Sequence, residues 1–274
     1  MQAPELFADG FAQPSGMALD VDDQFFVAET GTGRIHKIAT DGIRAPFAET
    51  GGRPAGIAFD DSSDLIVAEE GRHDLLIVSF DGSFEIYAHQ CRGKRFTGPR
   101  ELCFSPNSDI LFTDSGGTQE ARGGIYRVDI DGDVVQMASG LACPTGLVVA
   151  EDGSSLFVAE TDRNRILVYE MDDQDKLENQ QVFVEFDEGN GPLALAFDSE
   201  GTLFVARPGV GLTQVDLDGK IIDAPFLSGT RPNGLLFGGT EYDELYISET
   251  DSGSIYRMHT DHPGQRPFAG PRGI

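Results

Sequence analysis

The stretch Gln-Pro-Ser-Gly-Met-Ala-Leu-Asp, residues 13–20, decides the fold because the chain repeats its pattern five more times. The second copy, residues 53–60, reads Arg-Pro-Ala-Gly-Ile-Ala-Phe-Asp, and the others begin at Gly98, Cys143, Gly191 and Arg231. Successive copies lie between 40 and 48 residues apart, measured at their prolines. Internal repetition with a period of about 20–50 residues is typical of solenoids, propellers and related arrays.

Each repeat contains short strand patterns and no sustained helical periodicity. A second apolar segment follows each copy and ends in a polar residue: Glu29, Glu69, Asp114, Glu160, Arg207 and Glu249. Third and fourth strand patterns come next, separated by Asp/Gly turn signals. Four short strands in each period are typical of a propeller blade, since one such sheet must stack on neighbours to bury both faces. The sequence therefore predicts an all-β, six-bladed β-propeller with four antiparallel strands per blade, as a single domain over residues 1–274.

Closure of the ring needs a strand from one end of the chain. Residues 4–8 and residues 266–269 both resemble the fourth strand of a blade. We expect the N-terminal segment to complete the last blade, because a strand from one end that pairs with strands from the other removes an open edge.

The composition is strongly acidic and limits the partners. Forty-six Asp and Glu residues oppose twenty Lys and Arg residues, so the formal net charge is -26. Such a surface repels phosphate backbones and anionic lipids, so we expect no nucleic-acid or membrane partner. A surface this negative would also suit a cytoplasm with a high salt concentration. With no secretory pattern in residues 1–10 and no long apolar run, we expect a cytoplasmic monomer that binds a small molecule.

Few motifs of known chemistry are present. Cys91, Cys103 and Cys143 are an odd number without C-x-x-C spacing, which argues against a disulfide framework or a thiolate zinc site. His73, in the loop after the second strand of blade two, could reach a mouth of the channel. A lone loop histidine is more often solvated than catalytic, although its pKa makes it usable. The chain contains no G-x-S-x-G, H-E-x-x-H, phosphate-loop or dinucleotide motif.

The blade topology places a site at one mouth of the channel. The start of each first strand and the end of each second strand meet there. The residue after each repeat proline then lines the channel, and we call this set the inner ring: Ser15, Ala55, Arg100, Thr145, Leu193 and Asn233. The ends of the second strands form a wider ring. Core positions repeat while the inner ring does not, as expected where function is added to a repetitive scaffold.

Arg100, Glu101 and Asp114 are the candidate catalytic residues. An acid that recurs at the end of five second strands is more often structural, capping a turn or pairing with an arginine. Arg100, the one base of the inner ring, could bind a ligand or pair internally with Glu101 or Asp114. The candidate substrate-binding residues are Ser15, Thr145, Asn233, Arg207 and His73.

Several segments resemble the senescence-marker-protein/gluconolactonase/luciferin-regenerating-enzyme-like family. Residues 98–102, 111–114, 143–147 and 237–239 are similar to the family's P-N-D-L, Y-F-T-D, P-N-G-L and F-G-G stretches. The resemblance covers nearly the whole chain, with NHL-repeat and strictosidine-synthase-like propellers as neighbours. It implies a six-bladed propeller that hydrolyses sugar lactones or related esters.

The resemblance also implies one divalent cation, often calcium, at the channel mouth. In the family the cation polarises the carbonyl while a carboxylate acts as general base. The family's ligand positions fall on Ser15, Arg100, Thr145 and Leu193, and none keeps its ligand. A hard cation requires several oxygens, including carboxylate, so we expect no metal at these positions. Arg100 could instead hold an anionic substrate group or an oxyanion.

Two functions of different classes remain open. The first is a divergent hydrolase of a lactone or ester, with Arg100 as the clamp and Glu101 or Asp114 as acid/base. Thr145 and Asn233 would orient the substrate, and a lyase or isomerase could use the same mouth. The second is a non-catalytic propeller that binds a small anionic ligand or a peptide. The substituted metal ligands favour the second function, and the retained polar groups favour the first.

Overall fold

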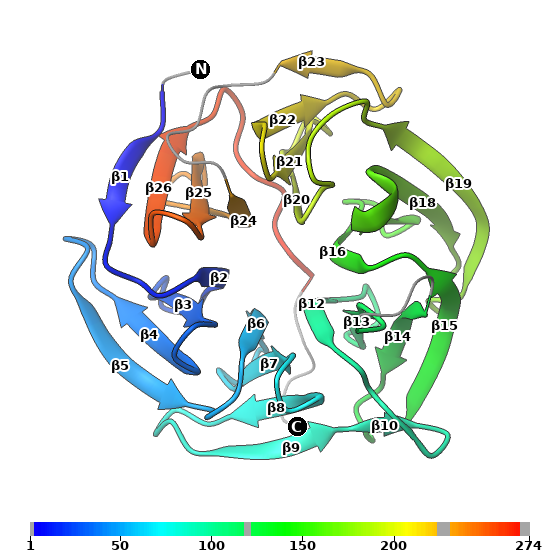
Figure 1. Ribbon diagram of the computed structural model, residues 1–274, viewed down its shortest axis with the longest axis horizontal. Helices are drawn as coiled ribbons and strands as arrows, with labels where there is room; N and C mark the ends of the chain where they lie inside the picture. Colours follow the sequence, from blue (N-terminus) through cyan, green and yellow to red (C-terminus); the bar gives the residue numbers. More distant parts are fainter. Residues whose placement is uncertain (1–2, 118–121, 224–230, 269–274) are drawn as a thin grey trace.

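A computed structural model describes residues 3–117, 122–223 and 231–268. It contains six four-stranded antiparallel sheets arranged radially around a central channel (Figure 1). This arrangement confirms the predicted six-bladed, all-β propeller. A short 3-10 helix, η1 (Thr161–Arg163), is the helical element of the described residues. No helix among these residues has the length and apolar character needed to cross a membrane.

The strands of each blade run outward from the channel in chain order. Blade one comprises β2 (Pro14–Leu19), β3 (Phe25–Glu29), β4 (Arg34–Ile38) and β5 (Arg44–Glu49). Blade two comprises β6 (Pro54–Phe59), β7 (Leu65–Glu69), β8 (Asp74–Val78) and β9 (Phe84–Ala88). A hairpin of β10 (Gln90–Cys91) and β11 (Lys94–Arg95) follows. Blade three comprises β12 (Pro99–Phe104), β13 (Ile110–Asp114), β14 (Gly123–Val128) and β15 (Val134–Leu141).

The remaining blades repeat the plan. Blade four comprises β16 (Pro144–Val149), β17 (Ser155–Glu160), β18 (Arg165–Met171) and β19 (Leu177–Glu185). Blade five comprises β20 (Ala194–Phe197), β21 (Leu203–Arg207), β22 (Gly211–Val215) and β23 (Ile221–Asp223). Blade six comprises β24 (Pro232–Gly238), β25 (Glu244–Glu249), β26 (Ser254–His259) and the N-terminal strand β1 (Glu5–Ala8).

The hydrophobic core lies between the blades. Every residue of β3, β7, β13 and β21 is buried, because the sheets on both sides cover these second strands. Aromatic rings pack across the blade interfaces. The Phe26 ring of blade one, for example, lies 4.9 Å from Phe47 in its own blade and 4.8 Å from Phe59 in blade two, measured between ring centroids. Burial of such faces on neighbouring blades drives the stacking of the propeller.

The two ends of the chain take different places. β1 pairs with β26, with Glu5 opposite Arg257, so the N-terminal segment completes blade six as predicted. Residues 266–268 resemble a fourth strand in sequence but form none, and Ala269 lies outside the described residues. This tail crosses the channel instead (Figure 1). Gln265 Nε2 donates to the carbonyl of Val149 at 2.9 Å, and Phe268 packs against the cores between blades two and three and between blades three and four.

Candidate functional site

The inner ring converges at one mouth of the channel. Its six residues line a common cavity of about 10 Å³ together with Glu101 and Gly146. Asn233 Nδ2 donates to Ser15 Oγ at 3.0 Å, and Thr145 Oγ1 donates to the carbonyl of Pro192 at 3.2 Å. A space of this size holds about one water molecule. A larger ligand therefore contacts the ring from the mouth side.

Arg100 forms an ion pair across a blade boundary. Its Nη1 lies 2.9 Å from Glu70 Oε2, and both side chains are about one quarter exposed, 24% and 25%. The partner is neither Glu101 nor Asp114, the two acids that the sequence suggested. Glu70 was missed, although the pair Glu69-Glu70 at the end of β7 was a visible signal. A partly exposed guanidinium with five N–H donors can engage a second anion while it keeps this pair.

A β-bulge exposes two consecutive residues of β12 to the channel. The ladder with β13 pairs Pro99 with Asp114 and Leu102 with Phe112, so one extra residue lies on β12 between these pairs. Consecutive residues of a regular strand point to opposite faces, whereas a bulge re-aims a side chain. Arg100 and Glu101 consequently both line the cavity at the mouth.

Glu101 occupies a place where the other blades carry Gly or Ala. The small residues two places after the repeat prolines are Gly16, Gly56, Gly146, Ala194 and Gly234. Glycine suits this place because the first strands of neighbouring blades are in direct contact.

A Cβ on Gly16 would lie 2.3 Å from the carbonyl oxygen of Ala55. The Glu101 carboxyl occupies the space that a side chain at Gly56 would need. A Cβ on Gly56 would lie 2.3 Å from Glu101 Oε1.

The surroundings of Glu101 favour its protonated form. Burial raises the pKa of this carboxyl to about 7, against a hydrogen bond from the Leu102 N–H at 3.2 Å and the nearby charge of Arg100. The side chain keeps some surface open to the channel, but protein walls surround the channel itself, so desolvation has the larger effect. A carboxyl with a pKa near neutrality can accept and return a proton at pH 7.

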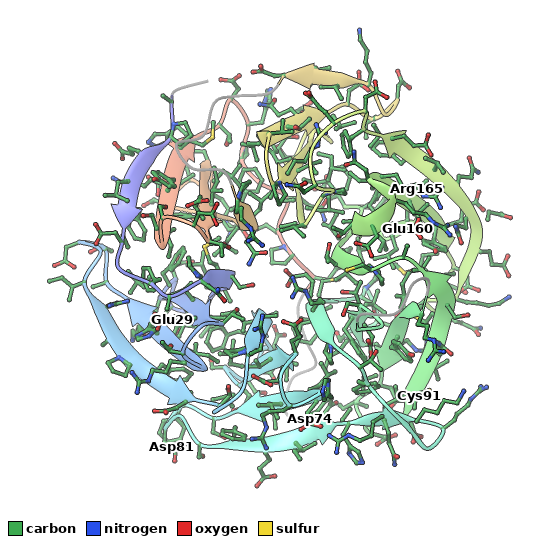
Figure 2. All side chains as sticks on the ribbon, viewed as in Figure 1. Glu29, Asp74, Asp81, Cys91, Glu160 and Arg165 are labelled. Atoms are coloured by element: carbon green, nitrogen blue, oxygen red, sulfur yellow. The ribbon has the colours of Figure 1, made fainter. Side chains whose placement is uncertain are left out.

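Asp114 makes the same kind of contact as the other acids of the wider ring. Its Oδ2 accepts from the Thr97 N–H at 2.7 Å, and its Oδ1 accepts from the Gly116 N–H at 3.0 Å. Glu29 and Glu160 (Figure 2) likewise accept from the backbone N–H groups of Ala12 and Ala142, at 2.6 and 2.8 Å. These carboxylates tie the loop before each repeat proline to the second strand. The geometry therefore supports the structural alternative for Asp114.

Arg207 replaces the acid of the wider ring in blade five and is nearly fully buried. Its guanidinium lies 3.9 Å from the Phe186 ring centroid, donates to the carbonyl of Glu188, and reaches Thr213 Oγ1 at 3.3 Å. These contacts are all with blade five and the loops next to it. The same loop that a carboxylate holds in the other blades is held here through a carbonyl oxygen.

His73 lies apart from the inner ring. It is exposed in the turn between β7 and β8, with a left-handed φ of 65°, and its N–H donates to the carbonyl of Glu69. The structure thus brings Ser15, Arg100, Glu101, Thr145 and Asn233 together around one cavity and leaves Asp114, Arg207 and His73 outside its lining.

The residues at the four implied metal positions do not suit a hard cation. Ser15 Oγ accepts from Asn233, Thr145 Oγ1 bonds to Thr161 and Pro192, Leu193 offers no ligand, and Arg100 adds a positive charge. Calcium requires six to eight oxygens, including carboxylates. Within residues 3–117, 122–223 and 231–268, no three His, Cys, Asp or Glu side chains are grouped to hold a metal.

Comparison with known proteins places these features in context. Residues 44–251 match the model of a protein family described as SMP-30/Gluconolactonase/LRE-like region. The diisopropyl-fluorophosphatase of Loligo vulgaris is 26% identical over 219 residues, which cover 72% of this chain and 68% of that protein. A gluconolactonase of Zymomonas mobilis is 27% identical over 188 residues, 62% of this chain and about half (52%) of the enzyme's length. The calcium-binding protein regucalcin of Agrobacterium tumefaciens has the same fold, with a TM-score of 0.85 at 16% identity over 99% of this chain and 98% of its own.

Proposed function

This chain belongs to the SMP-30/gluconolactonase/LRE-like family, and from that premise we propose that it hydrolyses a lactone or ester of a small anionic substrate at the inner ring. The observation that carries the proposal is the pair of side chains on the β12 bulge. Glu101 supplies a carboxyl with a pKa of about 7, and Arg100 supplies a fixed positive charge in the same cavity lining.

The chemistry needs one proton acceptor and one cation. The Glu101 carboxylate removes a proton from water as the water oxygen attacks the substrate carbonyl carbon. Arg100 stabilises the oxyanion that forms, or holds a carboxylate of the substrate next to it. The protonated Glu101 then returns the proton to the departing ring oxygen, so the carboxyl ends the cycle in its initial state.

The charge of Arg100 lies at a position where the family resemblance implies a metal ligand. Because the four residues at those positions do not fit a cation, the step above involves the protein's own groups alone. Ser15 and Asn233 hold each other by a hydrogen bond, and Thr145 is held by the carbonyl of Pro192. These contacts keep the ring preorganised around Arg100, which favours binding at a fixed geometry.

A pH-stat assay tests this function. Proton release from a panel of neutral and carboxylate-bearing lactones is measured in excess EDTA for the wild type, Glu101→Gln and Glu151→Gln. Glu151 is an exposed carboxyl in the β16–β17 turn and serves as the matched control. We expect turnover by the wild type and the control, and a loss of about 10²–10⁴-fold in Glu101→Gln, the range typical of a lost acid/base group. Equal rates in Glu101→Gln and the wild type would remove the proposed role of Glu101.

The narrowness of the inner ring supports a second function, that of a small-molecule-binding propeller without catalysis. Hydrogen bonds between ring members leave a cavity of only about 10 Å³, and Arg100 already has an anionic partner in Glu70. In that case calorimetry detects a carboxylate-bearing ligand that binds in an Arg100-dependent manner, while the same ligand is recovered unchanged after long incubation.

A further inference from the structure

A second and larger cavity lies deeper in the channel, beyond Glu101 from the inner ring. Its volume is about 220 Å³, and we call it the chamber. Its wall comes from the first strands of all six blades, at positions two to five residues after each repeat proline. Most of this wall is apolar, and its large side chains include Phe59, Leu102, Leu147, Leu195 and Leu236.

The tail of the chain lies at the other end of the chamber. Pro267 and Phe268 belong to its lining, and the backbone before them is fixed to blade five, where the Gln265 N–H donates to the carbonyl of Phe197 at 2.9 Å. Figure 1 shows this segment passing across the centre of the ring. The tail therefore covers part of the chamber at the end that lies away from the inner ring.

Glu101 is the one residue lining the chamber that titrates near neutral pH. Cys103 and Tyr242 also line it, but burial raises the pKa of each to about 12, so both stay neutral at pH 7. Among the lining residues, Glu101 alone borders both the chamber and the cavity of the inner ring. An apolar wall with one buried carboxyl is suited to a ligand that is apolar except for a single polar group.

We propose that the chamber is a binding site for a compact, uncharged, mainly apolar molecule about the size of indole, whose one N–H or O–H group donates to the Glu101 carboxyl. The size follows from the volume, since an apolar cavity of about 150 Å³ accommodates benzene. The polarity follows from the single carboxyl in the wall. The chamber shares Glu101 with the proposed lactone site, but its ligand lies beyond the inner ring and needs neither Arg100 nor turnover.

Calorimetric titration with a matched pair of probes tests the chamber. Indole carries an N–H donor, and indene has nearly the same shape without it. We expect the full-length protein to bind indole at least about fivefold more tightly than indene, the effect of one hydrogen bond to a buried acceptor. In Glu101→Leu this preference should vanish. No binding of either probe at millimolar concentration would overturn the site, and an unchanged preference in Glu101→Leu would overturn the contact with Glu101.

Two variants of the chamber wall, Ala58→Leu and Phe268→Ala, distinguish binding in the chamber from binding at other surfaces. Ala58→Leu adds bulk to the wall, whereas Ala45→Leu makes the same change on the exposed outer strand β5. Indole affinity should fall at least tenfold in Ala58→Leu and stay unchanged in Ala45→Leu. Phe268→Ala enlarges the chamber, so carbazole, which is larger than indole, should bind this variant at least tenfold more tightly than the wild type. Circular dichroism establishes that each variant is folded. If Ala58→Leu and Phe268→Ala both fold and bind their probes with wild-type affinity, the probes bind elsewhere and the proposal is refuted. If Ala58→Leu does not fold, the result for Phe268→Ala decides alone.

Discussion

At the scale of single residues, Arg100 and Glu101 depart from the pattern that the other blades share. The corresponding positions elsewhere carry Ser, Ala, Thr, Leu or Asn, followed by Gly or Ala. Neither the ion pair of Arg100 with the partly exposed Glu70 nor the burial of Glu101 serves a purpose that the other five blades require. The register shift itself also occurs in blades one, two, four and six, so the departure lies in the two side chains that blade three places on it, as expected of a site on a repetitive scaffold.

Substitution of Arg100 by alanine separates a ligand-binding role from a structural one. We expect Arg100→Ala to lose about 2–4 kcal/mol of binding or transition-state stabilisation toward carboxylate-bearing lactones. Its free energy of unfolding should fall by less than about 1 kcal/mol, because the pair with Glu70 is partly solvated. Glu70→Gln is the matched control, since it breaks the same pair and keeps the cation. A variant that melts several degrees lower yet retains wild-type kcat/KM would refute the role of Arg100.

The raised pKa of Glu101 predicts a pH dependence of stability. A carboxyl whose pKa rises from 4.5 to about 7 on folding binds its proton more tightly in the folded state. Its contribution is therefore complete below about pH 4.5 and is lost as the pH rises through about 7.

Urea unfolding at pH 5 and pH 8 measures this contribution. The wild type should lose up to about 3 kcal/mol more than Glu101→Gln over this interval, since one pKa unit is about 1.36 kcal/mol. Groups other than Glu101 titrate equally in both proteins and cancel in the comparison. Parallel pH profiles for the two proteins would show that the carboxyl is not desolvated.

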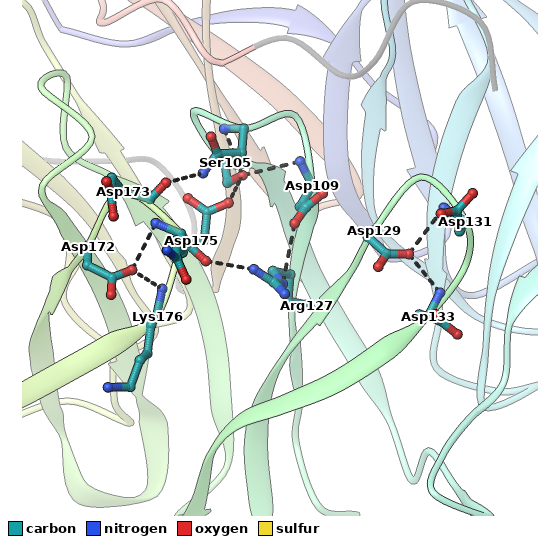
Figure 3. Close-up of polar contacts among 12 residues, drawn as sticks. Ser105, Asp109, Arg127, Asp129, Asp131, Asp133, Asp172, Asp173, Asp175 and Lys176 are labelled. Atoms are coloured by element: carbon teal, nitrogen blue, oxygen red, sulfur yellow. Dashed lines mark hydrogen bonds and ion pairs between the residues drawn. The ribbon is translucent and has the colours of Figure 1, made fainter.

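At the scale of elements, turns on the face opposite the inner ring link neighbouring blades. In blades one, two and five, an aspartate after the first strand accepts two N–H groups of its own turn: Asp20, Asp60 and Asp198. Blade three carries Ser105 at this place, and Ser105 Oγ donates to Asp175 in the β18–β19 turn of blade four (Figure 3). Ser105 Oγ also accepts from the N–H groups of Asn107 and Asp109 in its own turn, both at 3.2 Å, so one hydroxyl holds the local turn and links two blades.

Removal of the Ser105 hydroxyl should destabilise the fold. Asp175 is 1% exposed, and its Oδ1 has no hydrogen-bond partner in the described part of the chain, so Ser105 is important for its solvation. We expect Ser105→Ala to cost about 1–3 kcal/mol in the free energy of unfolding, the penalty for an unsatisfied buried polar group. Ser154→Ala removes a similar Ser–Asp bond at an exposed turn and should change stability by less than about 0.5 kcal/mol. Equal effects of the two substitutions in urea unfolding would show that Asp175 is solvated by other means.

At the scale of the whole molecule, the net charge of -26 opposes the compact state. Salt screens this repulsion, since the screening length falls from about 30 Å at 10 mM to about 3 Å at 1 M. We expect the melting temperature to rise by several degrees between these NaCl concentrations. Sucrose at matched osmolality is the control for general solute exclusion. A flat melting temperature in NaCl would mean that opposite charges are already well distributed, as in pairs such as Glu160 and Arg165.

The sequence by itself determined the fold and the location of the inner ring. Both follow from a local pattern that occurs six times, because the residue after each repeat proline must occupy the same place in every blade. Arg100 and Glu101 stood out in the sequence for the same reason, because they break the pattern that the other repeats share at these two positions. The structural role of the wider ring was also predictable, since a residue type that recurs in five blades serves a need that all five share.

Only the tertiary structure decided which groups meet across blades. Glu70 pairs with Arg100 because β7 of blade two ends beside β12 of blade three, and the angle between two blades is set by core packing rather than by either segment. The tail was ambiguous for a related reason. Residues 266–268 resemble a fourth strand locally, but β1 already pairs with the outer edge of β26. Because a sheet edge accepts one strand, the tail packs Phe268 against the core at the channel instead, and this covers part of the chamber beneath Glu101.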